Sequence, residues 1–572
     1  MTQMGGRRGS RTLSAVRAGL VGLAGWSLGL MALAQAVPPA TDPGRLRERF
    51  DIQTAPDTDA APPALDTQRP PSLPDSFRTV RVTLQRIRVE GSSVLPAAVL
   101  QSRTEAYTGR EIGGNDILQL ASELTAMYRN AGYILSLVLV PPQSLAEGTL
   151  TLQVVEGYIN AVTVQAGEGV SATVRESLAR IGEQIKASRP LDALVLERYL
   201  LIANDFPGLE LRSILSPSRA QGAADLTLVA SIKSVEGFAS VDNYGSKYLG
   251  PGQMLAGVTG NQLLGVNDQW RAIAVGTGDR EMAYGQLAYS QVVNTEGLKL
   301  SVAVSRARTQ PGDVLRPFDV RGAADTTSLS VTYPLLRSRN ESLFARVTYD
   351  HADIRTDILG ARVIDDRIRA LRLGLSWRVL DRLDGQNVLE LDFSQGLGGT
   401  DEGDLLKSRA GARGVFSKLG FDYERVQFFS ASTSLAFGIA GQWANTPLLS
   451  SEQYALGGRR YGRAYEPAEL VGERALAVRI EPRYAGVLDV PGLRSYQTFG
   501  FYDLGKVRRV GSLAAGTPAS QSLASAGIGV RLFLQNNLSA SMEAALPLTK
   551  TVASERSSHK DVRLSGSLML RF

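Results

Sequence analysis

The chain of 572 residues contains no cysteine and only two histidines, His351 and His559. The absence of cysteine excludes a disulfide scaffold and a thiolate metal site, and the scarcity of histidine argues against a zinc centre. Neither histidine has a catalytic motif around it, which disfavours a lipase or protease, because those enzymes need a Ser/His or Asp/His arrangement. We therefore expect no enzyme activity, no metal and no cofactor.

The chain also lacks a strong charge bias and is poor in aromatic residues. Lys and Arg number 62 against 56 Asp and Glu, giving a net charge of +6, and aromatic residues make up 7%. No basic cluster is interleaved with stacking aromatics, so we predict no nucleic-acid binding. A hydrophobic fraction of 44% and a mean hydropathy of −0.05 exclude both a disordered polymer and a polytopic helical membrane protein.

Long hydrophobic runs are missing except at the N-terminus. Residues 1–36 have the layout of a secretory signal, with a basic start, an uncharged stretch over residues 18–33 and a cleavage site at Ala34-Gln35-Ala36. A transmembrane anchor is the alternative, since the apolar run is nearly long enough. No other segment reaches the ~20 apolar residues of a membrane helix, so a mature protein in a membrane must be a β-barrel.

Residues 37–76 divide into a short helix and a linker. Thr41 or Asp42 can cap a helix within 37–53, and Leu46 and Phe50 lie on one of its faces. A frayed, solvated turn is the alternative for so short a segment. Residues 54–76 are rich in Pro, Ala and Asp, which predicts a stiff, extended linker.

Two small α+β domains are predicted next, over residues 77–158 and 159–235. In the first, a strand ends at Gly91, a helix runs from about Asn115 to Gly132, and strands follow at 134–140 and 149–155. The second has a similar order of elements: a strand at 161–164, helices at 173–185 and 191–203, and strands at 209–215 and 225–230.

From residue 236 to residue 572 the helical period disappears. Segments of 9–15 residues alternate apolar and polar side chains, as Leu564, Gly566, Leu568 and Leu570 do in the last one. A soluble β-sandwich would also alternate, but here the opposite face carries charge in strand after strand. About sixteen such segments predict a closed, antiparallel, 16-stranded barrel with a polar lumen and an outer face toward lipid.

Several ordered motifs resemble the two-partner secretion transporters (TpsB proteins, the ShlB-FhaC-HecB family), which belong to the superfamily of POTRA-domain barrels. The resemblance covers nearly everything after Phe77. The motifs in the small domains and the first barrel strand are Gly132-Tyr133, Val140-Pro141-Pro142-Gln143, Val154-Val155-Glu156-Gly157, Pro190-Leu191, Leu196-Glu197-Arg198, Asn204-Asp205-Phe206-Pro207-Gly208 and Asn243-Tyr244-Gly245.

Two barrel motifs carry the functional part of the resemblance. The run from Gly457-Gly458 to Arg463-Ala464-Tyr465 is similar to the tip of the family's sixth extracellular loop, usually Val-Arg-Gly-Phe/Tyr. Gly462 stands where Val is usual and Ala464 where Gly is usual, and we expect Ala464 to resist a positive φ angle.

The second motif, Phe501-Tyr502-Asp503-Leu504-Gly505, matches the family's F-x-D-x-G strand motif. The resemblance implies that Arg463 meets Asp503 inside the barrel, where an Arg–carboxylate fork is a directional anchor. The alternative is a solvated loop arginine.

The resemblance implies an outer-membrane pore with POTRA domains in the periplasm at residues 77–158 and 159–235. It would recognise one secreted, TpsA-type exoprotein of adhesin or haemolysin type and pass it unfolded to the cell surface. Residues 37–53 stand where the family has a pore-plugging helix. We expect outer-membrane lipid as surroundings, a single copy of the chain, and recognition of Phe572 by the barrel assembly machinery.

The small domains offer candidate contacts for the exoprotein. Tyr133 and Val140 on one predicted strand, and Leu196 and Leu200 on one predicted helix, are candidates, with core packing as the favoured alternative. Two other functions stay open. An assembly or insertion factor of the same superfamily would normally have more POTRA units, and a small-solute porin has no use for two such domains.

Overall fold

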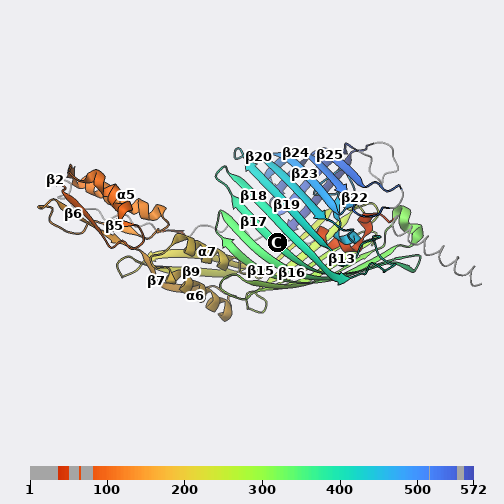
Figure 1. The fold of residues 1–572 in the computed structure, drawn as a ribbon, viewed down its shortest axis with the longest axis horizontal. Helices are drawn as coiled ribbons and strands as arrows, with labels where there is room; N and C mark the ends of the chain where they lie inside the picture. The colour runs from red at the N-terminus through yellow and green to blue at the C-terminus, as the bar shows by residue number, and fades with distance from the viewer. Residues whose placement is uncertain (1–36, 51–63, 66–80, 514–515, 550–559) are drawn as a thin grey trace, which may run out of the picture.

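The computed structural model describes residues 37–50, 64–65, 81–513, 516–549 and 560–572. The predicted signal (1–36) and most of the predicted linker (54–76) lie outside these ranges. The described chain forms two small α+β domains and a barrel, which follow one another along the long axis of the molecule (Figure 1).

Sixteen antiparallel strands close into the barrel, as the sequence predicts. Consecutive strands pair throughout, and β10 pairs with β27 to close the ring. The barrel strands are β10 (Val235–Asp242), β11 (Gln253–Asn261), β12 (Asp268–Thr277), β13 (Met282–Val292), β14 (Lys299–Thr309), β15 (Arg321–Arg337), β16 (Glu341–Ile358), β17 (Ala361–Leu380), β18 (Gly385–Gly399), β19 (Ser417–Phe428), β20 (Thr433–Ala444), β23 (Arg474–Gly486), β24 (Leu493–Arg508), β25 (Ser520–Leu534), β26 (Leu538–Pro547) and β27 (Arg563–Arg571).

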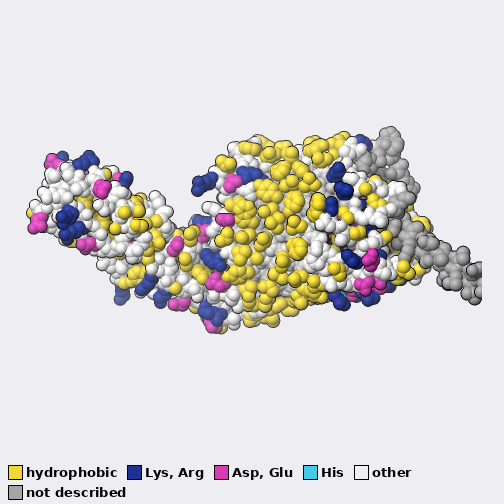
Figure 2. Space-filling model, viewed as in Figure 1, with side chains coloured by type: hydrophobic (Ala, Val, Ile, Leu, Met, Phe, Trp, Pro, Cys, Tyr) yellow, Lys and Arg dark blue, Asp and Glu magenta, His cyan; other side chains and the backbone are white. Residues whose placement is uncertain are grey.

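The outer wall of the barrel is apolar because side chains alternate between its two faces. On β17, Leu371, Leu373 and Leu375 are 37%, 48% and 43% exposed, while Arg372 between them points into the lumen toward Glu452. Figure 2 shows the resulting belt of apolar side chains across the visible face of the barrel, with charged side chains on both sides of it. Among the described residues, no helix is long and apolar enough to cross a membrane.

The first small domain packs two helices on short strands. Its elements are β2 (Arg81–Thr83), β3 (Arg86–Glu90), α4 (Ala97–Thr104), η3 (Glu105–Tyr107), β4 (Glu111–Gly113), α5 (Gly114–Asn130), β5 (Leu137–Leu139) and β6 (Thr149–Val155). The single strand predicted up to Gly91 is wrong, because Leu84 and Gln85 bond to Arg110 and Gly148 and split it into β2 and β3. The strand predicted at 134–140 shortens to β5, and α4 and β4 were not predicted.

The second small domain has two helices on a four-stranded sheet of order β1-β8-β9-β7. Its elements are β7 (Tyr158–Ala166), α6 (Ala172–Ala187), α7 (Ala193–Asn204), β8 (Leu209–Pro217) and β9 (Ala223–Ile232). The fourth strand, β1 (Ala64–Leu65), comes from the predicted linker and pairs in parallel with β8. This part of the linker is therefore sheet rather than free extended chain.

The second small domain is bonded to the turns between strands at the end of the barrel that faces it. Arg337 bonds both carboxylate oxygens of Asp205 at 2.8 Å, and the Tyr199 hydroxyl donates to Glu296 at 2.7 Å. Burial raises the pKa of the Asp205 carboxyl, although Arg337 opposes this. Burial and the bond to Glu296 raise the pKa of Tyr199 to about 12. These contacts define where the domain stands relative to the barrel mouth.

Candidate functional site: an occupied barrel lumen

A long loop (residues 445–473) joins β20 to β23 at the far end of the barrel and folds back inside. It contains η5 (Ser450–Glu452) and a hairpin of β21 (Tyr454–Leu456) and β22 (Leu470–Gly472). Leu456, Tyr465 and Leu470 are buried against Phe501, Val507 and Leu523 of the barrel wall. Apolar contact therefore brings the loop tip to β24 and β25.

At the tip, Arg463 and Asp503 form a two-pronged ion pair. Arg463 Nε lies 3.1 Å from Asp503 Oδ2, and Nη2 lies 3.1 Å from Oδ1. The backbone N–H groups of Gly462 and Arg463 donate to Oδ2 as well, both at 3.2 Å. The two side chains are 4% and 0% exposed, so the pair is shielded from solvent, where charge-assisted bonds are stronger than in water.

The guanidinium of Arg463 has further partners on the wall. Its Nη1 bonds Glu481 on β23 at 2.6 Å and lies 3.9 Å from Glu543 on β26. The ring centroid of Phe501 lies 3.5 Å from its central carbon. Arg463 thus connects three strands of the wall to one loop. A buried charge with so many partners is strongly positioned, and removing it leaves the carboxylates uncompensated.

Three glycines at the loop tip adopt backbone angles that other residues rarely take. Gly457, Gly458 and Gly462 have positive φ angles of 106°, 87° and 86°. Ala464, which we expected to resist a positive φ angle, does not adopt one: Gly462 carries the left-handed conformation one residue before Arg463. Gly505 of the strand motif leaves room for Leu456, whose Cδ1 would lie 2.6 Å from a Cβ at that position.

The N-terminal segment (residues 37–50) also lies inside the barrel. It consists of η1 (Pro39–Thr41), η2 (Pro43–Arg45) and α2 (Leu46–Phe50), and residues 51–53 of the predicted helix are outside the described chain. Asp42 caps η2 by accepting from the Gly44 N–H at 2.9 Å. Leu46 and Phe50 are buried, and Phe50 packs on Tyr284 of β13 with centroids 5.8 Å apart.

Three alternate arginines hold this segment to the lumen. Arg45 donates to the carbonyls of Ser450 and Gln453 in the long loop. Arg49 donates to the carbonyl of Tyr244 at 2.9 Å and to Gln253 at 3.0 Å. Arg47 bonds Asp350 on β16 at 3.0 Å.

Asp350 links the N-terminal segment to the long loop. Besides Arg47, it accepts from Arg372 on β17 at 2.6 Å. Arg372 in turn bonds Glu452 of the long loop at 2.7 Å. A continuous chain of ion pairs therefore runs from the segment through the wall to the loop. Disturbing one of the two lumen elements removes a charge partner from the system that holds the other.

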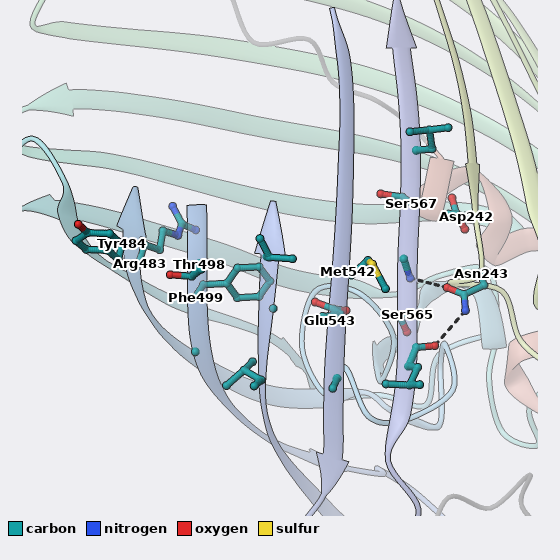
Figure 3. A pocket seen from close by; sticks show the side chains of 18 of the residues that line it. Asp242, Asn243, Arg483, Tyr484, Thr498, Phe499, Met542, Glu543, Ser565 and Ser567 are labelled. Carbon is teal, nitrogen blue, oxygen red and sulfur yellow. Dashed lines mark hydrogen bonds between the residues drawn. The ribbon is translucent and has the colours of Figure 1, made fainter. Parts of the chain in front are cut away.

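The long loop also contacts both sides of the barrel seam. The β10–β27 ladder covers Phe238–Asp242, with further backbone bonds between Gly237 and Phe572 and from the Asn243 N–H to the Gly566 carbonyl. At this end the side chain of Asn243 also donates to the Leu564 carbonyl and accepts from the Gly566 N–H (Figure 3). Glu466 of the loop lies 3.5 Å from Arg563 on β27 and accepts from the backbone N–H of Lys247 after β10. The seam is thus fastened partly by side chains.

Sequence reasoning missed Asp350, Arg372, Glu452 and Glu466 as parts of the site. They are single charged residues in strands or loops whose composition differs little from that of their neighbours. Asp350 carried one signal, a lumen-facing carboxylate in an alternating strand, but many barrel positions share it.

The other predicted residues fall in different places. Tyr133 and Val140 are half-buried against the core of the first domain, and the strand between them, β5, is an edge strand paired only with β6. Leu196 and Leu200 are 2% and 6% exposed in the core of the second domain, so their side chains are not available to a partner in this fold.

Phe572 is 63% exposed on the outer wall, with its backbone bonded to Gly237. Within the described ranges, no cluster of three metal-ligating side chains occurs.

A closed 16-stranded barrel, two small domains at one mouth and a loop anchored inside define a class of outer-membrane protein transporter. The family model for the haemolysin secretion/activation proteins ShlB/FhaC/HecB matches residues 225–532, and that for the ShlB-type POTRA domain matches residues 82–157. The chain belongs to this family. It is a two-partner secretion transporter of the outer membrane that translocates an exoprotein, and its POTRA domains are periplasmic.

Relatives agree with this assignment. The heme/hemopexin transporter protein HuxB of Haemophilus influenzae (strain 86-028NP) is 24% identical over 456 residues, 78% of this chain and 80% of its own. The outer membrane transporter CdiB of Dickeya dadantii is 24% identical over 425 residues, 70% and 72% of the two chains. The solved structure of CdiB from Escherichia coli has the same fold, with a TM-score of 0.66, 18% identity and coverage of 92% and 95%.

Proposed function

We propose that this transporter passes one exoprotein of adhesin or haemolysin type, unfolded, through a pore that is closed at rest by two elements. The observation that carries the proposal is the occupied lumen: the N-terminal segment and the long loop both lie in it and share the ion-pair chain Arg47–Asp350–Arg372–Glu452. A polypeptide can pass only when these elements move. The pore acts without catalysis and draws on folding of the exoprotein outside the cell.

Recognition starts in the periplasm, at the edge of the first POTRA domain. β5 leaves one side of its ladder unpaired, and an extended segment of the exoprotein can add to such an edge by main-chain hydrogen bonds. Tyr133 and Val140 flank this edge and provide apolar contacts beside it. The transporter acts as a single chain in outer-membrane lipid, and its assembly depends on Phe572.

A cysteine tether tests whether the N-terminal segment must leave. A Cβ at Gly44 would lie 2.9 Å from the Cβ of Ser451 in the long loop, within about 1 Å of the distance that a disulfide spans. Because the chain has no native cysteine, Gly44→Cys/Ser451→Cys gives one defined crosslink. We expect exoprotein release to stop under oxidising conditions and to return with reductant, while each single cysteine variant secretes normally. Undiminished release by the oxidised double variant would exclude exit of the segment.

Recognition is tested by deleting residues 81–155. The deletion should abolish release of the exoprotein and leave a heat-modifiable barrel in the outer membrane, because the first domain contributes no barrel strand. Normal secretion by this variant would contradict the proposed role. The adjacent gene should encode the exoprotein, and a very long β-helical secreted product there would identify the substrate class.

A further inference from the structure

We propose that the outer wall over β20 and β23–β26 binds a phosphorylated glycolipid of the outer leaflet, through a basic rim at the extracellular end and an apolar groove below it. Two features of this wall, a cluster of like charges and a concavity, lie on the same strands. Neither belongs to the pore.

The basic rim consists of Arg474, Lys506 and Arg508. The strand pairing of β23 and β24 places Arg474 directly opposite Arg508, and Leu476 directly opposite Lys506. Side chains alternate along a strand, and Leu476 and Leu504 are 49% and 45% exposed on the outer wall, so the three basic side chains share this lipid-facing side. They stand at its extracellular border.

Like charges directly opposite each other destabilise a sheet unless an anion lies between them. The even-numbered, outward positions of β23, β24 and β25 contain no acidic residue, and neither does the connection 509–519. Glu473, next to Arg474, is fully buried on the inner side, where it bonds Gln453. The rim therefore has an excess of about three positive charges.

Arg474 is held in one orientation before any ligand arrives. Its guanidinium carbon lies 3.9 Å from the ring centroid of Trp443, its Nε donates to the Ala444 carbonyl at 2.9 Å, and its Nη2 donates to Asn445 at 2.8 Å. Trp443 is 56% exposed, as interfacial aromatics of barrels are. A flat, fixed guanidinium beside two exposed basic side chains suits a phosphate better than a mobile lysine does.

The groove lies on the same wall, further from the extracellular end of β24. Figure 3 shows the side chains that line it. It has a volume of about 1170 Å³, beyond the ~300–1,000 Å³ usual for small-molecule pockets. The small residues Gly500, Ala544 and Gly566 form its floor. The larger side chains of Ile528, Met542 and Leu564, each about 70% exposed, project from the wall beside that floor. β24 runs from Arg508 at the rim to Gly500 at the groove, so a lipid with its phosphate at the rim directs its acyl chains along Leu504 and Tyr502 into the groove.

The positive charges of the rim favour a phosphorylated lipid over the uncharged or zwitterionic lipids that surround any barrel. An uncharged or zwitterionic lipid fills the groove but leaves the three basic side chains of the rim without an anion. A lipid with phosphates on its sugar headgroup fills the groove with its acyl chains and neutralises the rim with its phosphates. On β14–β17 the same border carries mixed charges instead, with Arg306 paired to Asp325 at 3.3 Å and Arg367 to Asp365 at 3.4 Å. That side of the barrel is therefore the natural control.

The test measures binding of bisphosphorylated lipid A and of its dephosphorylated form to the full-length protein in detergent, by native mass spectrometry. Loss of one basic side chain should lower the affinity about fivefold, so Lys506→Gln/Arg508→Gln should weaken binding of the bisphosphorylated form about 25-fold. The control, Arg306→Gln/Arg367→Gln, should bind as the wild type does. Equal binding by the wild type and K506Q/R508Q, or no preference for phosphates, would overturn the proposal.

A second variant separates the groove from the rim. A Cβ at Gly500 meets only the Gly527 carbonyl oxygen, at 3.8 Å, so Gly500→Leu fills the groove without a clash. It should lower affinity and keep the preference for phosphates, whereas Gly285→Leu, an equally open position on β13, should change nothing. If K506Q/R508Q lowers exoprotein release but leaves lipid binding intact, the rim is a protein contact and the lipid proposal fails.

Discussion

Arg463 in the long loop holds both carboxylate oxygens of Asp503 on β24, with N–O distances of 3.1 Å each. The two residues are 40 positions apart in sequence. The pair is buried, and it adds a directional bond to the apolar contacts that bring the tip to the wall.

Replacing either partner should free the loop tip. Arg463→Ala or Asp503→Ala should impair secretion or alter channel conductance with little loss of folded barrel. The pair should be coupled by ~1–3 kcal/mol, because each single change removes the same interaction. The double variant should therefore be no worse than the worse single, as measured by planar-bilayer conductance and exoprotein release. Arg459→Ala, at the same tip but without a bond to Asp503, is the control, and fully additive defects would disprove the anchor.

Weakening the N-terminal segment should open the resting pore. Arg47→Gln removes one ion pair to Asp350 but leaves Arg372 to satisfy that carboxylate. We expect a higher open probability in planar bilayers, since the segment keeps only its Arg45 and Arg49 anchors. Asp353→Asn, on the same strand but facing outward, should behave as the wild type. An unchanged open probability in Arg47→Gln would show that apolar packing of Leu46 and Phe50 alone retains the segment.

The seam should be sensitive to one asparagine. Asn243→Ala removes two side-chain hydrogen bonds to β27, worth about 0.5–1.5 kcal/mol each, where a single backbone bond from Asn243 to Gly566 ends the ladder. The temperature at which the folded band converts to the unfolded band in gel electrophoresis should fall by several degrees (~1 kcal/mol is a few degrees). Asn340→Ala, in an exposed periplasmic turn, should leave it unaltered. Equal conversion temperatures for both variants would mean that the ladder alone holds the seam.

The terminal residue should matter for assembly rather than for transport. Phe572 exposes its ring on the outer wall above Gly237, where a Cβ would lie 2.3 Å from its Cζ. Deleting Phe572, or replacing it by Asp, should lower the amount of barrel in the outer membrane if, as we propose, the assembly machinery recognises this terminal ring. Immunoblots of membrane fractions measure this. Phe393→Ala, an outward aromatic on β18, is the control, and unchanged levels in the Phe572 variants would contradict the assignment.

The sequence determined the architecture because alternation and length are local properties. Apolar residues at every second position, over segments long enough to cross a bilayer, are sufficient for a barrel, and the closed ring of sixteen strands confirms that prediction. In the small domains, α5 and α6 followed from the helical period. β2 and β3 did not, because Leu84 leaves the ladder to bond to a residue 26 positions away, Arg110.

The contacts inside the lumen depend on the tertiary structure. The sequence motifs pointed to Arg463 and Asp503, but nothing local shows that Asp350 faces Arg47 across 303 residues, or that Glu466 reaches both sides of the seam. Likewise, the Arg474–Arg508 opposition exists only in the register of β23 and β24. Such contacts depend on strand register and on where a loop folds back. Register and loop position are set by the packing of the whole barrel, and a single segment of sequence carries no record of them.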